Sequence, residues 1–148
     1  MFKRIVVGLD GSETSENALR TACDLAQKYD AELHLVHTPQ PSPVAFPMGA
    51  VAGYHAATTM PSMEEVTSGG EKILNSGAAI VQELNQAVAH VHLGTGTPAG
   101  DIIHYAKNGR ADLIVTGRRG LGAVGGLVLG STTQRINQDA ECACLSII

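Results

Sequence analysis

Short apolar runs alternate with segments of helical periodicity along the whole chain of 148 residues, and this alternation limits the possible folds most. The runs expected to form strands cover residues 5–9, 33–38, 88–93, 113–116 and 142–148. The segments expected to form helices cover residues 12–30, 63–87, 98–109 and 131–139. Strands that alternate with helices in this way pair in parallel and are covered on both faces by the helices. We therefore expect an α/β fold, a doubly wound parallel sheet forming a single domain over residues 1–148.

Two segments interrupt this rhythm. The connection 39–61 carries five of the six prolines, and so long a connection in a compact domain is typical of a lid, a binding loop or a disordered segment. Within the helical segment 63–87, Gly69 and Gly70 could break the first part of the helix.

Composition excludes several classes of protein. Apolar residues make up 44% of the chain and charged residues 16%, which is typical of neither a disordered nor a membrane protein, and we expect no membrane insertion. The net charge of −4 gives no electrostatic reason to expect nucleic acid as a partner. Three cysteines do not make a disulfide framework, and no export signal is evident. We therefore expect a cytoplasmic protein with reduced thiols.

The segment 115–132, VTGRRGLGAVGGLVLGST, connects the end of a strand to the start of a helix and contains six glycines. Glycines let backbone N–H groups turn toward a ligand, and the N-terminus of the following helix adds further donors and a partial positive charge. Arg118 and Arg119 lie at the mouth of this loop. The segment therefore predicts a phosphate site, of the kind that nucleotides occupy.

This segment is not a Walker P-loop. That motif ends in Gly-Lys-Ser or Gly-Lys-Thr, whereas here Leu129 is followed directly by Gly130 and Ser131, with no lysine between the glycine and the serine. Without the lysine, phosphoryl transfer lacks a usual stabiliser of charge, so binding is favoured over catalysis. Ser131 and Gln134 also fit a capping box, which would compete with a phosphate for the same amide groups.

Other candidates for the site follow the first two strands, since ligands of open α/β sheets lie beyond the carboxyl ends of the strands. Asp10, before Gly11, either caps the turn or accepts hydrogen bonds from the ribose or base of a ligand. His37 ends the second strand and is expected to pack beneath the site.

The remaining motifs have simpler interpretations. Gly94, Gly96 and Gly100 depart from the dinucleotide spacing and indicate an ordinary strand-to-helix turn. The pairs Cys142 with Cys144 and His90 with His92 each share one strand face. Both pairs lack further ligands nearby in the sequence, which favours packing over metal binding.

Over its full length the chain resembles the universal stress protein family. The matching segments are FKRIVVGLDGS at 2–12, LVH at 35–37, GTPAGDII at 96–103, ADLIVTG at 111–117 and GRRGLGAVGGLVLGSTTQRI at 117–136. The last of these resembles the ATP-binding signature of one branch of the family. The resemblance implies a sheet with strand order three-two-one-four-five, similar to the adenine nucleotide alpha-hydrolase fold, and binding of ATP or AMP, with Mg²⁺ or Mn²⁺ held through the phosphates.

The resemblance also implies roles for individual residues. Gly8, Leu9 and Asp10 would approach the adenosine, and Thr38 would contact adenine through its backbone. The groups expected to hold the ribose and phosphates are Gly117, Gly120, Gly130, Ser131, Thr132 and Thr133. The residues expected to line the path to them are Arg118, Arg119, Leu121, Gly122 and Ala123.

Members of the family generally form homodimers through the last strand, and an apolar edge strand is a liability that dimerisation would cover. One departure concerns this edge, because residues 141–144 (ECAC) stand where the family usually has a proline. We thus expect a nucleotide-dependent stress or signalling module with an unknown protein partner and no catalytic residue. The alternatives are a slow ATPase or adenylating ATP-pyrophosphatase-like enzyme, and a protein-interaction module that binds no nucleotide.

Overall fold

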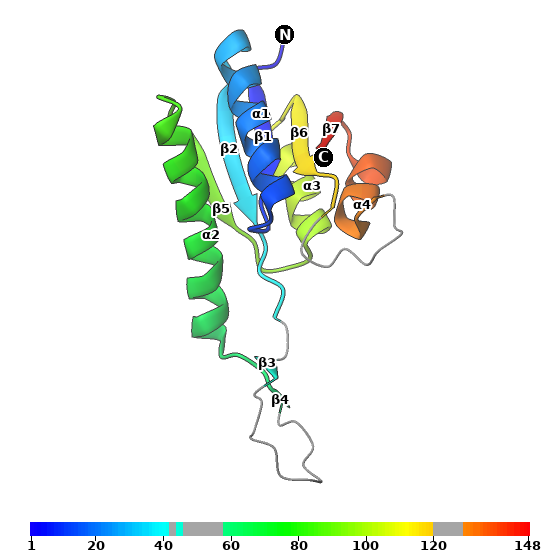
Figure 1. Ribbon diagram of the computed structural model, residues 1–148. Helices are drawn as coiled ribbons and strands as arrows, with labels where there is room; N and C mark the ends of the chain where they lie inside the picture. The colour runs from blue at the N-terminus through cyan, green and yellow to red at the C-terminus, as the bar shows by residue number, and fades with distance from the viewer. Residues whose placement is uncertain (42–43, 46–57, 120–128) are drawn as a thin grey trace.

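A five-stranded parallel sheet forms the centre of the molecule (Figure 1). The computed structural model describes residues 1–41, 44–45, 58–119 and 129–148. Along the sheet the strands are β5 (His90–Leu93), β2 (Glu32–His37), β1 (Arg4–Gly8), β6 (Leu113–Gly117) and β7 (Ala143–Ile147). This order confirms the arrangement three-two-one-four-five, since β3 and β4 belong to a separate two-stranded sheet.

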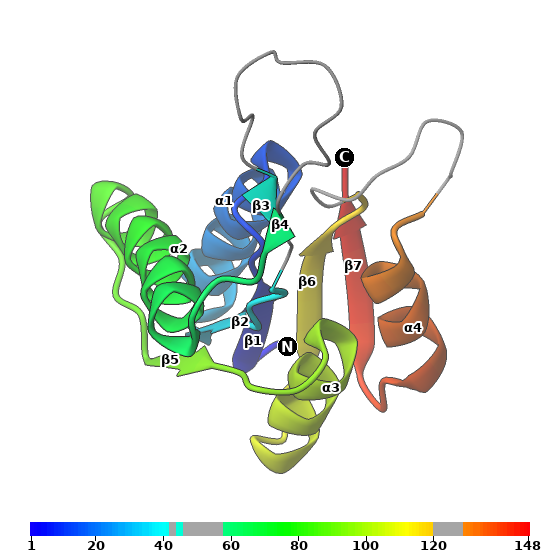
Figure 2. The ribbon, with the colours of Figure 1, turned by 90° about the horizontal axis from the view of Figure 1, so that it is seen from below.

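Four helices cover the two faces of the sheet, as the sequence predicts. They are α1 (Glu13–Tyr29), α2 (Met63–Glu83), α3 (Pro98–Asn108) and α4 (Ser131–Asp139). Figure 2 shows α1 and α2 on one side of the strands and α3 and α4 on the other. From Ile5 onward the central strand β1 is apolar because both of its faces are covered: Val7 packs in the core beneath α1 and α2, while Val6 packs in the core beneath α3.

Helix α2 is continuous from Met63 to Glu83, so Gly69 and Gly70 do not break it. Gly70 and another glycine of the helix, Gly77, let α2 approach the sheet closely. A Cβ atom at Gly70 would lie 2.6 Å from Leu93 Cδ1, and one at Gly77 would lie 2.6 Å from Leu9 Cδ1. The packing of α2 against the strand ends therefore depends on residues that lower its intrinsic helix propensity.

The proline-rich connection 39–61 contains a short antiparallel pairing that the sequence pattern does not predict. Strand β3 (Val44–Ala45) pairs with β4 (Thr58–Thr59), and both lie beyond the carboxyl ends of the sheet strands (Figure 1). Residues 42–43 and 46–57 lie outside the described residues, as does 120–128 within the glycine-rich segment.

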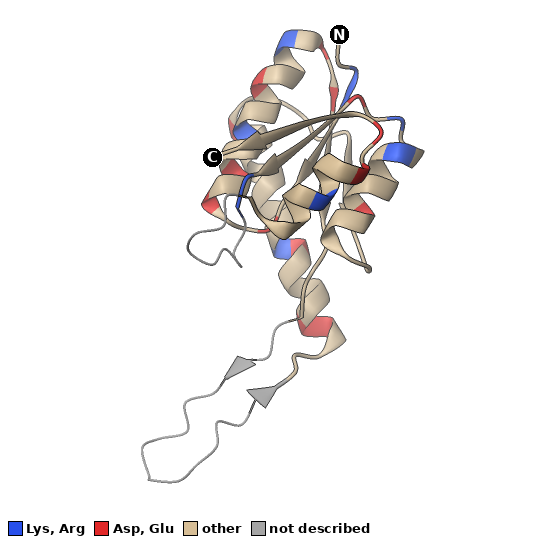
Figure 3. Ribbon diagram, turned by 90° about the vertical axis from the view of Figure 1, so that its right-hand side faces the viewer, with Lys and Arg blue, Asp and Glu red and all other residues tan. Residues whose placement is uncertain are grey.

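Charged residues of both signs are interspersed over the helices and turns (Figure 3). Lys107 pairs with Glu141 and Arg135 with Asp139, all on exposed side chains. Such exposed pairs contribute little to stability. None of the helices in the described part of the chain is long and apolar enough to cross a membrane.

Candidate functional site

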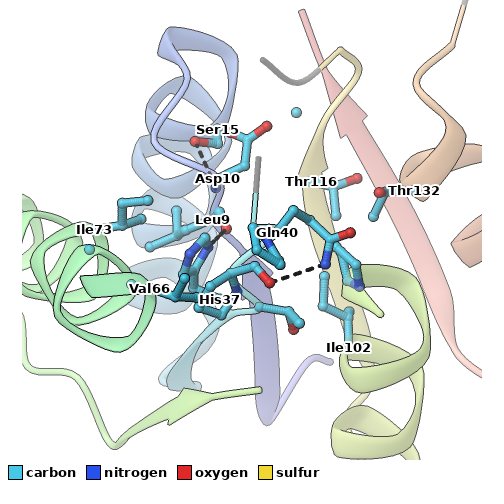
Figure 4. A pocket seen from close by; sticks show the side chains of 18 of the residues that line it. Leu9, Asp10, Ser15, His37, Gln40, Val66, Ile73, Ile102, Thr116 and Thr132 are labelled. Atoms are coloured by element: carbon cyan, nitrogen blue, oxygen red, sulfur yellow. Dashed lines mark hydrogen bonds between the residues drawn. The ribbon is translucent and has the colours of Figure 1, made fainter. Parts of the chain in front are cut away.

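A cavity of about 540 Å³ opens at the carboxyl ends of β1, β2 and β6 (Figure 4). This volume lies in the range of small-molecule sites, about 300–1,000 Å³. Helix α2 supplies one wall through Val66 and Ile73, and Thr116 and Thr132 lie on the opposite side (Figure 4). The cavity thus lies where open α/β sheets bind their ligands.

The structure brings seven of the expected site residues to this cavity: Gly8, Leu9, Asp10, Thr38, Gly117, Thr132 and Thr133. Four others are described but are not part of its lining: Arg118, Arg119, Gly130 and Ser131. The remaining four lie outside the described residues: Gly120, Leu121, Gly122 and Ala123. Segments distant in the sequence therefore meet at one site, as the topology predicts.

The turn from β1 into α1 is held by Asp10 and Ser12. Asp10 Oδ1 accepts the N–H of Ser12 at 2.9 Å and its hydroxyl at 2.5 Å. Ser12 Oγ in turn accepts the N–H of Ser15 at 3.2 Å as the N-cap of α1. Gly11 between them has a φ of 80°, a conformation that favours glycine. Asp10 therefore holds the turn, one of its two expected roles, and it also lines the cavity.

The end of β2 is held by a carboxylate that the sequence interpretation missed. Asp101, in the first turn of α3, accepts the hydroxyl of Thr38 at 2.8 Å and the N–H of Gly96 at 2.9 Å. A Cβ atom at Gly94 would lie 2.1 Å from the same carboxylate oxygen, so glycine makes room for it. The strand-to-helix turn expected around Gly94 and Gly96 therefore also positions Thr38. The acidic residue after Thr97 and Pro98 was the available signal.

Helix α4 begins without a side-chain cap. Gly130 is the N-cap and Ser131 the first helical residue, so the expected capping box of Ser131 and Gln134 is wrong. The N–H of Gly130 donates to Arg118 O at 2.8 Å, and Thr133 Oγ1 donates to Gly117 O at 2.8 Å. The first turn of α4 also contains no acidic residue. Its N–H groups and the helix dipole therefore favour an anion at this end of the cavity.

Gly117 brings the end of β6 close to the start of α1. A Cβ atom there would lie 2.8 Å from the carbonyl carbon of Thr14 and 3.0 Å from the backbone nitrogen of Ser15. Thr14 Oγ1 also donates to the carbonyl of Arg119. The first residues of the glycine-rich segment are thus fastened to α1 beside the cavity.

His37 lines the cavity beneath these turns and is 6% exposed. Its Nδ1 lies 2.7 Å from the carbonyl oxygen of Leu9, a contact visible in Figure 4. Because a carbonyl only accepts, Nδ1 carries the proton in this contact.

A second group of histidines lies away from the cavity, where β2 and β5 meet α3. His34 Nδ1 is 2.9 Å from the hydroxyl of Tyr105, the His34 and His90 rings are 5.0 Å apart, and His92 stacks on Tyr105 at 4.9 Å. Burial lowers the pKa of His34. In residues 1–41, 58–119 and 129–148, no group of three or more His, Cys, Asp or Glu side chains is arranged to hold a metal ion.

The cysteines pack in the two cores. Cys23, a residue of α1, is fully buried in the core between α1, α2 and the sheet, and burial raises its pKa to about 11. Cys142 and Cys144 pack against the core beneath α3 and α4, as expected for a pair on one strand face, and burial raises their pKa values too.

Comparison with known proteins extends over nearly the whole chain. The profile of the Universal stress protein family matches residues 1–147. A universal stress protein of Thermus aquaticus is 33% identical over 149 residues, covering 99% of both chains. One of Methanocaldococcus jannaschii is 28% identical over 148 residues, covering 99% of this chain and 82% of the relative.

Solved structures of universal stress proteins share the fold. One from Archaeoglobus fulgidus has a TM-score of 0.73 at 21% identity and covers 100% of this chain and 99% of its own. A structure from the same organism in complex with dAMP has a TM-score of 0.69 at 19% identity, covering 100% and 98%. A family protein from Arabidopsis thaliana with AMP bound has a TM-score of 0.63 at 19% identity, covering 98% and 90%.

Proposed function

This chain belongs to the universal stress protein family, and on that basis we propose that it binds an adenine nucleotide, ATP or AMP, in the cavity beyond β1, β2 and β6. The observation that carries the proposal is the cavity itself, which has the end of β2 on one side and the uncapped start of α4 on the other. Relatives with dAMP and AMP bound support the same class of ligand.

The base would lie near Thr38, between apolar walls. Leu9, Val66 and Ile73 line one side of the cavity and Ile102 the other. A flat aromatic base gains stability from burial against such side chains. The backbone of Thr38 would contact the base, and Asp10 would contact the ribose.

The phosphates would lie at the N-terminus of α4, close to Thr132 and Thr133. The N–H groups of the first helical turn have no side-chain cap and favour an anion there. We assign the glycine-rich segment, including Arg118, Arg119 and residues 120–123, to the same phosphate end, with Mg²⁺ or Mn²⁺ held through the phosphates.

Titration calorimetry with ATP, AMP, adenosine and GTP tests the proposal, with thermal shift as a second readout. We expect ATP or AMP to bind more tightly than adenosine, because adenosine has no phosphate, and more tightly than GTP, because the base differs. Absence of both heat and thermal shift at millimolar ATP and AMP would refute nucleotide binding.

A nucleotide can act as a signal only if it binds two conformations of the protein with different affinity. We propose that this protein works as such a nucleotide-dependent stress or signalling module in the cytoplasm. Hydrogen exchange of the protein with and without ATP measures the difference between the two states, and identical exchange would contradict the signalling role while leaving binding intact.

We also propose that two copies pair through β7. Gly117 and Ile147 are partners in the sheet, and Ile147 O accepts the N–H of Arg118. Since backbone groups alternate sides along a strand, the N–H of Ser146 points away from β6, toward the edge. A Ser146→Pro variant removes that donor without removing a hydrogen bond to β6. We expect it to shift the mass measured by analytical ultracentrifugation from dimer to monomer, whereas a monomeric wild-type protein would contradict the pairing.

A further inference from the structure

The hydrogen bonds between β1 and β2 stop one step earlier than the strands allow. The N–H of Leu9 donates to Val36 O at 2.9 Å. In a parallel ladder the next bond would run from the N–H of Thr38 to the carbonyl of Leu9. That carbonyl instead lies 2.7 Å from Nδ1 of His37. The side chain of His37 therefore bonds the Leu9 carbonyl, which would otherwise accept the backbone N–H of Thr38.

Because the His37 ring takes the place of the Thr38 N–H at the Leu9 carbonyl, that N–H has no partner among the described residues. Thr38 is 5% exposed and lines the cavity. The carbonyl of the neighbouring His37 accepts the N–H of Gly94 at 2.7 Å and so points toward β5. Backbone groups of successive residues point to opposite sides of a strand, so the N–H and C=O of Thr38 point toward β1. The N–H and C=O of Thr38 thus form a donor–acceptor pair at the cavity, beyond the end of β1. Its side chain is held on the α3 side by Asp101.

The imidazole itself is fixed in place. Helix α2 packs closely against Pro39 and His37 at Gly70. A Cβ atom at Gly70 would lie 2.7 Å from Pro39 Cγ and 3.2 Å from His37 Cδ2. The second ring nitrogen, Nε2, has no partner among the described residues. In the described part of the chain, every fully buried side-chain nitrogen or oxygen has a partner. Since Nε2 has none, it must be accessible to solvent. His37 lines the cavity, so Nε2 is accessible from there.

We propose that His37 is a positioning residue for base recognition: it takes the carbonyl of Leu9 and so keeps the N–H of Thr38 free to donate to a ring nitrogen of the bound base. The adjacent C=O of Thr38 then accepts from the exocyclic amino group. Adenine presents this acceptor and donor side by side, whereas guanine presents an N–H and a carbonyl at the same positions. The inference rests on the proposed nucleotide function and adds the device that prepares its base contact.

The first test measures the Thr38 amide directly and needs no nucleotide. We expect its hydrogen exchange to be fast in the free wild-type protein and at least about tenfold slower in His37→Ala, where the N–H can reach the Leu9 carbonyl. His37→Asn should keep the fast exchange, because an amide nitrogen can replace Nδ1 as donor to that carbonyl. The matched control is His34→Ala on the same strand, whose ring bonds Tyr105 away from the cavity.

The second test compares AMP with its 1-deaza analogue, which lacks the ring nitrogen that would accept from Thr38. A buried donor without its partner weakens binding, so we expect the wild-type protein and His34→Ala to prefer AMP by about tenfold, or about 1.4 kcal/mol. In His37→Ala this preference should fall below about threefold. A purely structural role would weaken both ligands equally and keep their ratio.

The two tests separate the inference from the function it rests on. If no nucleotide binds, the proposed function fails and the amide exchange still decides the role of His37. A Thr38 amide that is already protected in free wild-type protein overturns the inference even if a variant fails to fold. An undiminished preference for AMP in folded His37→Ala overturns it as well.

Discussion

Two helix N-termini, those of α1 and α4, face the same cavity and are built in opposite ways. Helix α1 starts with the Ser12 cap and carries Glu13 and Glu16 in its first turn, with Asp10 bonded to the cap. Helix α4 starts at Gly130 with neither a side-chain cap nor an acidic residue in its first turn. Among the described residues, the first turn of α1 therefore carries its own negative charge, whereas the first turn of α4 carries none.

The other two helices resemble α1. Helix α2 has a capping box of Ser62 and Glu65, and α3 has Thr97 as its cap and Asp101 in the first turn. Orphan N–H groups at a helix start are stabilised by a side chain, by water or by a ligand. Of the four described helices, α4 alone has neither a side-chain cap nor an acidic residue in its first turn, which is why we assign the phosphates to it rather than to α1.

The strongest way to break this contrast is to give α4 a cap like that of α1. In Gly130→Asp a carboxylate would take the first-turn N–H groups and repel a phosphate, since the φ of −67° and ψ of 149° at Gly130 suit an N-cap side chain. We expect the affinity for ATP to fall by about tenfold or more, from a loss of about 1–3 kcal/mol, while adenosine binds as before.

Gly130→Asn is the matched control, because it caps the helix without charge and should lose less affinity than Gly130→Asp. Calorimetry with ATP and adenosine on both variants measures the difference. Equal affinities for ATP in the wild-type protein and Gly130→Asp would place the phosphates elsewhere.

The reverse change removes the cap of α1. Ser12→Ala deletes the acceptor for the Ser15 N–H and a partner of Asp10. We expect the free energy of unfolding to fall by about 1 kcal/mol, the usual cost of losing such a cap, as measured by urea denaturation. Ser131→Ala on α4 is the control and should leave stability nearly unchanged, because Ser131 is exposed and does not cap its helix. Equal losses in the two variants would contradict the contrast between the termini.

The smallest effect concerns backbone amides at the opposite end of the sheet, where the protein again supplies a carboxylate. Asp112 Oδ2 accepts the N–H of Lys3 at 2.8 Å and of Arg4 at 2.9 Å, and these hydrogen bonds lower its pKa. A lowered folded pKa adds stability above the unfolded value of about 3.9, and this stability is lost as the pH falls through the folded value. We expect Asp112→Asn to be less stable than wild type at pH 7, with a gap that narrows below about pH 4.

Urea denaturation of the wild-type protein and Asp112→Asn at pH 7, 4 and 2.5 measures the difference in their free energies of unfolding at each pH. A gap of constant size at all three pH values would show that Asp112 stabilises the fold in some way other than through its charge.

The sequence predicted the elements whose signals are local. The run from Ile5 to Leu9 is apolar because β1 is covered on both faces, and Thr97 with Pro98 starts α3 as capping preferences require. The strand order came from the resemblance to the family, and the structure confirms it.

The features that were missed depend on partners distant in the chain. Gly70 lies within α2, where its lack of a side chain lets the helix pack closely against Leu93. Gly130 rather than Ser131 is the N-cap of α4, and its N–H donates to the carbonyl of Arg118. The contact of Asp101 with Thr38 joins residues 63 positions apart, which no local pattern can indicate.

The burial of Cys23 has a chemical consequence for a protein of this family. Oxidants attack the thiolate, and because burial raises the pKa of Cys23 to about 11, the thiol stays protonated at pH 7. The residue also has no exposed surface through which a peroxide could reach it. In an oxidising cell the core beneath α1 and α2 would therefore keep its sulfur reduced, and the fold would outlast conditions that modify exposed cysteines elsewhere.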